Sequence, residues 1–387
     1  MPSWKFRCGR MGRAGVMAGG MAGVLALTGC GQFFPPLSSG GGGGGGGTST
    51  GDYLYIGDLG TSPLSVAGFT LGSSKLSVIS GAPWSVSLEA TALAVTPSNS
   101  YLYLGSAAGG IYVYTIGTSG GLTLGNGGVP VATGVSPAVL RVDTTGKYLL
   151  GASEFSGQVY VYQIGTGGAL TAISSSVVTL NSSNPSTDME ITPNDNYVYV
   201  SCGTAGIYTL SFNSTTGALA QVNSVLTPKQ TNAADNGMTI APSGSYLFAA
   251  ETVTGGVRVF SIGTGGTLTE TSGSPYTTAT GAWAVLVDST GSYVYVVNRA
   301  QGNISGFLLS NSGALTAIAG SPFTTGTLPV AMVEDKTDAY LAVICSGGSP
   351  DLQIFTFNGS TAGALTNFAT ATTGTDPTQA SSIAATH

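Results

Sequence analysis

The segment Tyr197-Val198-Tyr199-Val200-Ser201-Cys202 decides the fold, because a short apolar strand that opens with an aromatic residue recurs along the chain. A turn rich in Pro, Asp, Asn, Gly or Ser precedes six of the seven copies. The copies are 48, 47, 49, 49, 47 and 47 residues apart, and a fixed period of this size indicates a repeat architecture. They begin at Tyr53, Tyr101, Tyr148, Tyr197, Tyr246, Tyr293 and Tyr340.

A second marker has the same period. It is a strand ending in an aromatic residue, followed by a Gly/Ser-rich turn and a leucine, as in residues 162–170. The spacings are 46, 48, 49, 49, 47 and 50 residues, so two independent markers give seven repeats. The leucines are Leu76, Leu122, Leu170, Leu219, Leu268, Leu315 and Leu365.

Each repeat has the pattern of four short strands rich in Val, Ile, Tyr and Thr. In the fourth repeat we expect them at 188–192, 197–202, 207–212 and 219–225. Repeats of 40–50 residues with four strands are typical of propeller blades. The sequence therefore predicts an all-β, seven-bladed β-propeller of four-stranded antiparallel blades.

The two ends of the predicted ring complement each other. The first repeat lacks its leading strand, because Gly51-Asp52-Tyr53 enters directly at the second strand. Residues 382–387 at the end of the chain resemble the leading strand at 92–97 of the second repeat. We expect the C-terminal strand to complete blade one, which would cover an exposed sheet edge. The propeller domain then spans residues 52–387.

The N-terminal region has the pattern of an export signal. Residues 1–13 carry four basic residues and no acidic one, and residues 14–28 are apolar or small. Leu27-Thr28-Gly29-Cys30 resembles the bacterial lipobox, whose cysteine is lipidated after cleavage. We expect residues 1–29 to be a lipoprotein signal peptide and 30–51 a lipidated Cys30 with a Gly-rich tether. This places the protein on a membrane at the cell envelope, and Gly31 favours the outer membrane where one exists; an ordinary signal peptide is the alternative.

The composition excludes several classes of partner. Charged residues make up 7% of the chain, and signal cleavage would leave seven basic residues against 17 acidic ones, a charge of −10. Nucleic-acid binding relies on Lys and Arg for phosphate contacts, so we expect no nucleic-acid partner. We expect a monomer without a cofactor. Cys202 and Cys345 lie in different repeats and are expected to be buried thiols.

Residues 311–323, Asn-Ser-Gly-Ala-Leu-Thr-Ala-Ile-Ala-Gly-Ser-Pro-Phe, resemble the hairpin signature of lactonase-type seven-bladed propellers. Gly273-Ser274-Pro275-Tyr276 and Val296-Val297-Asn298 resemble the same family, which includes 6-phosphogluconolactonase. The resemblance extends over residues 52–387. It specifies the scaffold, and it implies hydrolysis of a sugar lactone as one possible activity. Fold alone does not fix the function.

The sequence contains few of the residues that catalytic sites commonly use. The only histidine is His387, the last residue, which leaves no histidine-based triad or histidine-rich metal site elsewhere. Residues 117–121 match G-x-S-x-G, but they lie in an expected hairpin and not in the strand-to-helix elbow that the motif requires. No metal site is predicted.

Charged residues on the leading strands form the main candidate site. Arg141, Asp188 and Glu190 are expected on one wall of the central channel, with Asp235 one step further out. Three interpretations are open: an ion-pair network that satisfies itself, a ligand-binding site, and an acid–base pair or hard-cation site. Arg141 could bind a carboxylate or a phosphate.

A second candidate group lies near one rim, where the second strands end. Its members are Asp58, Glu154, Glu251, Asn298 and Arg299. The alternative is that they are simply polar residues at the starts of loops. Trp84 and Trp283 are expected to be core residues and not platforms for a sugar.

Two functions remain open at this stage. The first is a binding or protein-interaction module at the cell envelope, favoured by the predicted lipid anchor and the missing catalytic histidine. The second is a hydrolase of sugar lactones, favoured by the family resemblance and the channel carboxylates. Of the two, the sequence favours the binding module.

Overall fold

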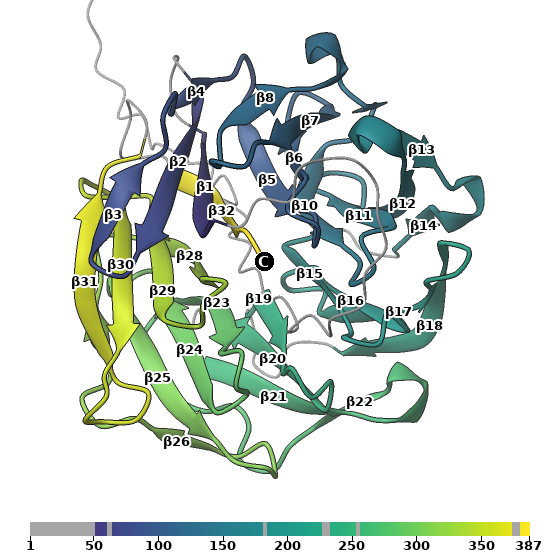
Figure 1. Ribbon diagram of the computed structural model, residues 1–387. Helices are drawn as coiled ribbons and strands as arrows, with labels where there is room; N and C mark the ends of the chain where they lie inside the picture. Colours follow the sequence, from purple (N-terminus) through teal and green to yellow (C-terminus); the bar gives the residue numbers. More distant parts are fainter. Residues whose placement is uncertain (1–50, 60–63, 181–183, 227–232, 253–255, 374–379) are drawn as a thin grey trace, which may run out of the picture.

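The computed structural model describes residues 51–59, 64–180, 184–226, 233–252, 256–373 and 380–387. The predicted signal peptide, Cys30 and the Gly-rich tether lie outside these ranges. The seven predicted blades are present as seven antiparallel sheets arranged in a ring, with the C-terminus near its centre (Figure 1). No helix in the described part is long and apolar enough to cross a membrane.

Each blade runs from an innermost strand at the ring centre to an outer edge. The first four, from the inside outward, are β32 (Ala380–Ala385), β1 (Tyr53–Asp58), β2 (Ser65–Gly72) and β3 (Lys75–Val78); β5 (Ala90–Val95), β6 (Tyr101–Ser106), β7 (Gly110–Ile116) and β8 (Leu122–Leu124); β10 (Pro137–Val142), β11 (Tyr148–Ser153), β12 (Gln158–Ile164) and β13 (Leu170–Ala172); and β15 (Asp188–Ile191), β16 (Tyr197–Ser201), β17 (Ile207–Asn213) and β18 (Ala218–Leu226).

The remaining three blades follow the same order. They are β19 (Asp235–Ile240), β20 (Tyr246–Glu251), β21 (Gly256–Ile262) and β22 (Leu268–Glu270); β23 (Ala282–Val287), β24 (Tyr293–Asn298), β25 (Asn303–Leu309) and β26 (Leu315–Ala317); and β28 (Pro329–Glu334), β29 (Tyr340–Cys345), β30 (Leu352–Phe357) and β31 (Leu365–Ala371). Four short 3₁₀ segments lie between strands: η1 (Asn126–Gly128), η2 (Thr166–Gly168), η3 (Ser174–Ser176) and η4 (Thr264–Gly266).

Four blades carry one strand more than the sequence predicts. In blade three, β13 pairs with the second half of β12, and β14 (Val178–Thr179) then pairs with its first half. The chain therefore returns to the same outer edge after the fourth strand, which leaves fewer backbone groups exposed there. The equivalent strands are β4 (Trp84–Ser85), β9 (Ala132–Thr133) and β27 (Phe323–Thr324).

The ring closes as the sequence predicts. The C-terminal β32 pairs antiparallel with β1, and in Figure 1 its yellow ribbon lies beside the purple β1. The Thr386 hydroxyl accepts the Tyr53 N–H at 2.9 Å. Asn99 of blade two holds both backbone groups of His387, at 2.7 and 2.8 Å. Burial lowers the pKa of His387 to about 4, so its imidazole is neutral at pH 7. The residue therefore helps to close the propeller.

The two sequence markers touch each other between successive blades. In blades two to seven, the glycine two residues before the marker leucine has a positive φ, and a Cβ there would come within 3.1 Å of the first tyrosine of the preceding blade. At Gly266 this Cβ would lie 2.5 Å from the Tyr197 ring. Tyr199, two residues on, donates its hydroxyl to the Gly266 carbonyl at 2.9 Å. The shared period of the markers therefore reports one contact repeated at the seams between blades.

The hydrophobic core is divided among these seams. One cluster joins Leu150 and Val161 of blade three to Val198 and Leu210 of blade four, and similar clusters lie between other neighbours. Cys202 belongs to this cluster, and it and Cys345 are buried thiols, as predicted. Residues 117–121 form the turn between β7 and β8, so the G-x-S-x-G match is part of a hairpin.

Candidate functional site

Arg141, Asp188 and Glu190 are brought together, and all three side chains are buried where the innermost strands of blades three, four and five meet. The Arg141 guanidinium lies 2.9 Å from Asp188 and 2.8 Å from Glu190. The three residues are only 4%, 0% and 2% exposed. Asp188 also accepts the backbone N–H of Met238 in blade five at 2.7 Å. The cluster thus joins blades three, four and five, which is the geometry of the self-satisfied ion-pair network.

The protonation of this cluster follows from its contacts. Burial raises the pKa of Glu190 to about 8 and that of Asp188 to about 6, while Arg141 opposes both shifts. Asp188 accepts two backbone N–H groups besides Arg141, and hydrogen bonds to the charged form favour ionisation. Glu190 therefore holds the proton near neutral pH, and Asp188 pairs with Arg141.

Asp235 belongs to a different cluster, contrary to its expected place beside the other three. It pairs with Arg258 of β21 at 2.8 Å, and Arg258 also contacts Glu270 at 3.3 Å. Glu251 is the cross-strand neighbour of Asp235. Burial raises the pKa of Asp235 to about 7 against the attraction of Arg258. Arg258 is not among the residues predicted from the sequence, although a lone cation inside a buried third strand indicates a carboxylate partner.

Three of the rim candidates are structural. Asp58 accepts the Ser65 hydroxyl at 2.9 Å and lies 3.3 Å from the Thr373 hydroxyl, at the seam between blades one and seven. The Asn298 side chain is buried against Asn303 and Ser305. Glu251, also buried, stays with the Asp235 cluster. These groups satisfy polar backbone and side-chain neighbours near the ends of strands.

Glu154 remains available on the rim. It follows β11, and its partly buried side chain has one buried oxygen, Oε2, without a hydrogen-bond partner. Its N–H donates to Ser136 at 2.9 Å, and the Ser153 hydroxyl accepts the N–H of Phe155 at 3.2 Å, which fixes the turn. Burial, and then the nearby Glu89, raise the pKa of Glu154. Its carboxylate is therefore a stronger base than an ordinary glutamate.

Arg299 is the second rim group that stays available. It follows β24, and its guanidinium lies 4.6 Å from the centre of the Trp283 ring. Its Nε is buried without a hydrogen-bond partner, and burial lowers its pKa. Trp283 itself packs against the core clusters on both sides of blade seven, so it is a core residue that also presents a ring to Arg299. Trp84 packs in the core near Tyr55.

Glu154 and Arg299 follow the second strands of blades three and six. Because each blade repeats the same strand directions, the ends of all second strands lie at one face of the ring. That face therefore carries Glu154, a carboxylate of raised pKa, on blade three and Arg299 on blade six, with blades four and five between them, and among the described residues no ion pair to Arg299 is formed. A carboxylate base and a cation are the groups that an ester hydrolysis by water requires.

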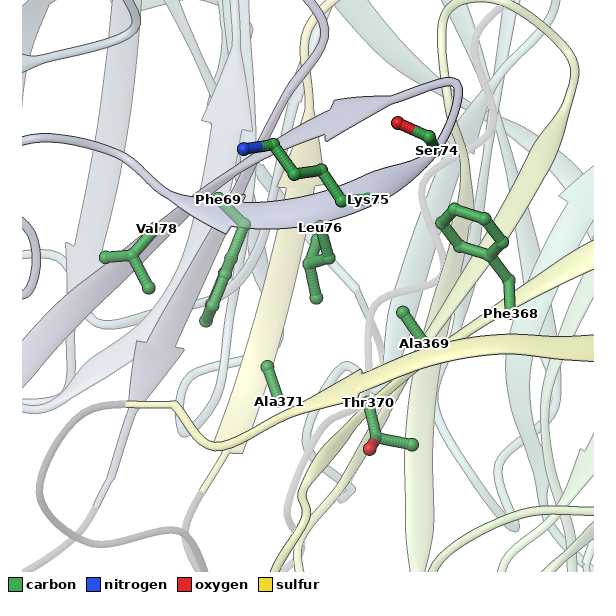
Figure 2. Close-up of a pocket in the computed structure, with 9 residues that line it drawn as sticks. All are labelled: Phe69, Ser74, Lys75, Leu76, Val78, Phe368, Ala369, Thr370 and Ala371. Carbon is green, nitrogen blue, oxygen red and sulfur yellow. The ribbon is translucent and has the colours of Figure 1, made fainter.

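A groove of about 320 Å³, lined by both apolar and polar residues, lies elsewhere, at the outer edge of the seam between blades one and seven. In Figure 2 Phe69, Leu76 and Ala371 point toward one another between β3 and β31. Lys75 is the only charged residue among those lining it. None of the candidate site residues lines this groove. Within the described ranges, no three His, Cys, Asp or Glu side chains converge in a way that could hold a metal ion.

The chain matches one protein family over most of its length. The family model described as lactonase, seven-bladed β-propeller matches residues 53–381, which is nearly the whole described ring. The resemblance drawn from residues 311–323 is thereby confirmed. A search of curated proteins gives no significant match.

Solved structures of the same fold cover the ring. A putative 6-phosphogluconolactonase from Bacteroides uniformis is 16% identical, with a TM-score of 0.72, over 87% of this chain and 99% of its own. The periplasmic gluconolactonase of Pseudomonas aeruginosa is 17% identical, with a TM-score of 0.70, over 87% and 99%. A protein from Lactobacillus plantarum is 21% identical, with a TM-score of 0.69, over 87% and 100%. At these identities the likeness shows a shared fold.

Proposed function

We propose that this chain, which belongs to the lactonase family of seven-bladed β-propellers, hydrolyses the ring ester of a sugar lactone outside the cytoplasm. The observation that carries the proposal is the family match over residues 53–381 together with the rim that presents Glu154 and Arg299. The protein would act as a monomer held on the envelope membrane by a lipid at Cys30.

The comparisons favour this hydrolase over the ligand-binding module that the sequence alone favours. Two of the similar structures carry lactonase names, and one of these is described as periplasmic. An exported enzyme fits the basic and apolar pattern of residues 1–28. An unphosphorylated lactone is the better substrate class, because the described rim offers Arg299 but no cluster of cations for a phosphate.

The proposed reaction uses one base and one cation. Glu154 removes a proton from a water molecule, whose oxygen then attacks the lactone carbonyl carbon. The carbonyl oxygen becomes an oxyanion, which the Arg299 guanidinium stabilises. The ring C–O bond then breaks, and the leaving alkoxide takes the proton back from Glu154. The products are one hydroxy acid, with Glu154 returned to its carboxylate form.

A pH-stat assay tests the proposal on the full chain in detergent. The substrates are a gluconolactone, its 6-phosphate and an uncharged lactone without hydroxyl groups, each corrected for spontaneous hydrolysis. We expect Glu154→Gln and Arg299→Gln each to lower the rate about 100-fold or more, the usual range for losing a base or an oxyanion donor. Glu190→Gln, a matched change in the buried ion-pair cluster, should leave the rate near that of wild type.

The outcomes separate the two functions. Hydrolysis lost in both rim variants but kept in Glu190→Gln supports the proposal. A folded protein that hydrolyses none of the lactones contradicts the proposal and favours the ligand-binding module. An equal loss of hydrolysis in Glu190→Gln would mean that the reacting groups do not lie on the rim.

A further inference from the structure

One seam of the ring lacks a contact that the other six have. In blades two to seven, a glycine in the turn between the third and fourth strands packs on the first tyrosine of the preceding blade, as Gly266 does on Tyr197. In blade five that turn has the five residues 263–267, whereas blade one turns within the two residues 73–74. The exposed Ser74 stands at the glycine position. The seam between blades seven and one therefore lacks the glycine contact.

The groove described above lies at this same seam, and both of its walls are outermost strands. β3 forms one wall and β31 the other (Figure 2). Tyr340, the first tyrosine of blade seven, stacks instead on Phe368 of the β31 wall, with ring centres 4.9 Å apart. Partly apolar surface of this kind is stabilised when a matching segment covers it. The apolar lining residues are Phe69, Leu76, Val78, Phe368, Ala369 and Ala371.

The described chain begins beside the groove. The Asp52 carbonyl accepts the N–H of Leu71 at 3.0 Å, and Leu71 pairs with Leu76 of the groove. The preceding residues lie outside the described ranges, but their sequence contains one apolar stretch. Between the predicted lipid site at Cys30 and the start of the ring, large apolar side chains occur only at residues 33–37, Phe-Phe-Pro-Pro-Leu, and no residue is charged.

We propose that residues 33–37 of this chain dock in the groove and supply the contact that this seam lacks. Residues 38–50 connect the two, and a Gly-rich linker of 13 residues has a root-mean-square length of about 20 Å. The four residues of β3 span about 13 Å, so the linker is long enough to reach along the groove. A partner on a linker of matching length has an effective concentration in the millimolar range. A groove of only millimolar affinity would therefore be occupied much of the time.

The chemistry of the segment fits the lining of the groove. Two successive prolines favour the extended polyproline II conformation, which docks on grooves lined by aromatic side chains, here Phe69 and Phe368. Prolines carry no N–H, so their burial leaves carbonyl acceptors and no unpaired donors. The ammonium group of Lys75 and the hydroxyls of Ser74 and Thr370 can donate to such carbonyls. The groove thus offers aromatic surface and donors to a segment that supplies aromatic rings and acceptors.

Docking would fix the distance between the ring and the membrane. With the predicted lipid on Cys30, only Gly31 and Gln32 would separate the lipid from the docked segment, a reach of about 10 Å at most. An undocked tether of residues 31–51 would allow roughly 25 Å. The outer edge of blades one and seven would then face the bilayer, and the rim would stay open to one side. This inference is independent of the hydrolysis proposed above.

Disulfide trapping in the full chain, purified in detergent, tests the docking. Ser38→Cys places a thiol beside the segment and Val78→Cys places one in the groove, while the two cysteines of the described ring are buried. A disulfide forms only when the two Cα atoms come within about 7 Å. Adding Phe33→Ser and Leu37→Ser removes docking side chains without changing the ring. We expect the intramolecular disulfide to form at least tenfold more slowly in that background, as measured by mass spectrometry.

Val129→Cys is the matched control for Val78→Cys. Both valines are exposed, by 59% and 61%, but Val129 lies in blade two and does not line the groove. Its disulfide with Ser38→Cys should form at the same rate with and without Phe33→Ser and Leu37→Ser.

Three outcomes would overturn the docking. The first is an equal rate at Val78→Cys with and without the two serine changes, which would mean that the tether only passes the groove. The second is a faster rate after those changes, which would mean that the apolar side chains lie in the detergent. The third is a disulfide between two chains whose yield rises with protein concentration, which would assign the groove to a second copy.

Discussion

Arg141 and Arg299 are the same residue type in one ring, yet they do different work. Arg141 sits on an innermost strand, where Asp188 and Glu190 enclose it at hydrogen-bond distance. Arg299 follows a second strand, stacks on Trp283 and keeps a buried Nε without a partner. The two arginines have the same charge. What differs is their place in the blade: the cation on an innermost strand is held by carboxylates, and the cation after a second strand is the candidate reacting group.

Replacing the inner arginine should give the largest effect. Arg141→Ala leaves Asp188 buried and ionised without its partner, and such a loss costs about 3–5 kcal/mol of unfolding free energy. Urea unfolding measures it. Lys147 is a partly exposed cation over the Tyr148 ring in the same blade, and Lys147→Ala should cost less than about 1 kcal/mol. Equal losses in the two variants would remove the contrast between inner and outer cations.

Gly265 and Gly266 offer a second comparison between a position with open space around it and one packed against a side chain. Gly265 and Gly266 both have positive φ, at 75° and 73°, so alanine at either costs about 1–2 kcal/mol. A Cβ at Gly265 meets nothing within 4 Å, whereas one at Gly266 strikes the Tyr197 ring. Gly266→Ala should therefore cost a further 1–3 kcal/mol or so in urea unfolding. Equal costs would mean that the ring of Tyr197 moves aside freely.

The inner clusters should make stability depend on pH with a definite sign. Burial raises the pKa of Glu190 to about 8 and of Asp235 to about 7, so the folded state holds these protons at pH values where the unfolded state has lost them. The unfolding free energy should fall as pH rises from about 4.5 to 8. Urea midpoints at pH 5, 6.5 and 8 measure this.

Glu190→Gln, which cannot lose a proton, tests the source of that dependence. The variant should be less sensitive to pH than wild type and should be closest to it in stability at pH 5. A wild-type protein that becomes more stable toward pH 8 would contradict the protonation assigned to the inner clusters.

The rim arginine should give the smallest change in stability. Arg299→Ala removes a stacking contact on Trp283 worth about 0.5–1 kcal/mol, and it leaves no buried carboxylate unpaired. Urea unfolding should show a loss within this range, while the pH-stat assay should show a large loss of hydrolysis. A stability loss as large as that of Arg141→Ala would make Arg299 structural as well.

Much of the ring could be predicted because its signals are local and repeated. The fourth repeat, expected at 188–192, 197–202, 207–212 and 219–225, forms strands at 188–191, 197–201, 207–213 and 218–226. The extra outer strands were missed because two-residue strands such as Phe323–Thr324 carry no period of their own. Their pairing is decided by the free edge that the third strand offers.

The candidate site could be predicted only in part. The sequence placed Arg141, Asp188 and Glu190 together, because residues at equivalent places on neighbouring innermost strands must meet. It did not show that they are enclosed, and it placed Asp235 with them when Arg258 holds it. It also could not separate Glu154 and Arg299 from Asp58, Glu251 and Asn298, since all five follow or end a second strand.

The sequence by itself determined the number of blades, the order of the strands and the closure by the C-terminal strand. Turn residues, strand alternation and a fixed period are properties of the chain, and they act over a few residues at a time. The tertiary structure alone decided which charges are satisfied, which carboxyl holds a proton and which rim groups stay open. Those properties depend on neighbours 47 to 315 positions away, from Arg141 with Asp188 to Asp58 with Thr373, whose distances and burial exist only once the ring has closed.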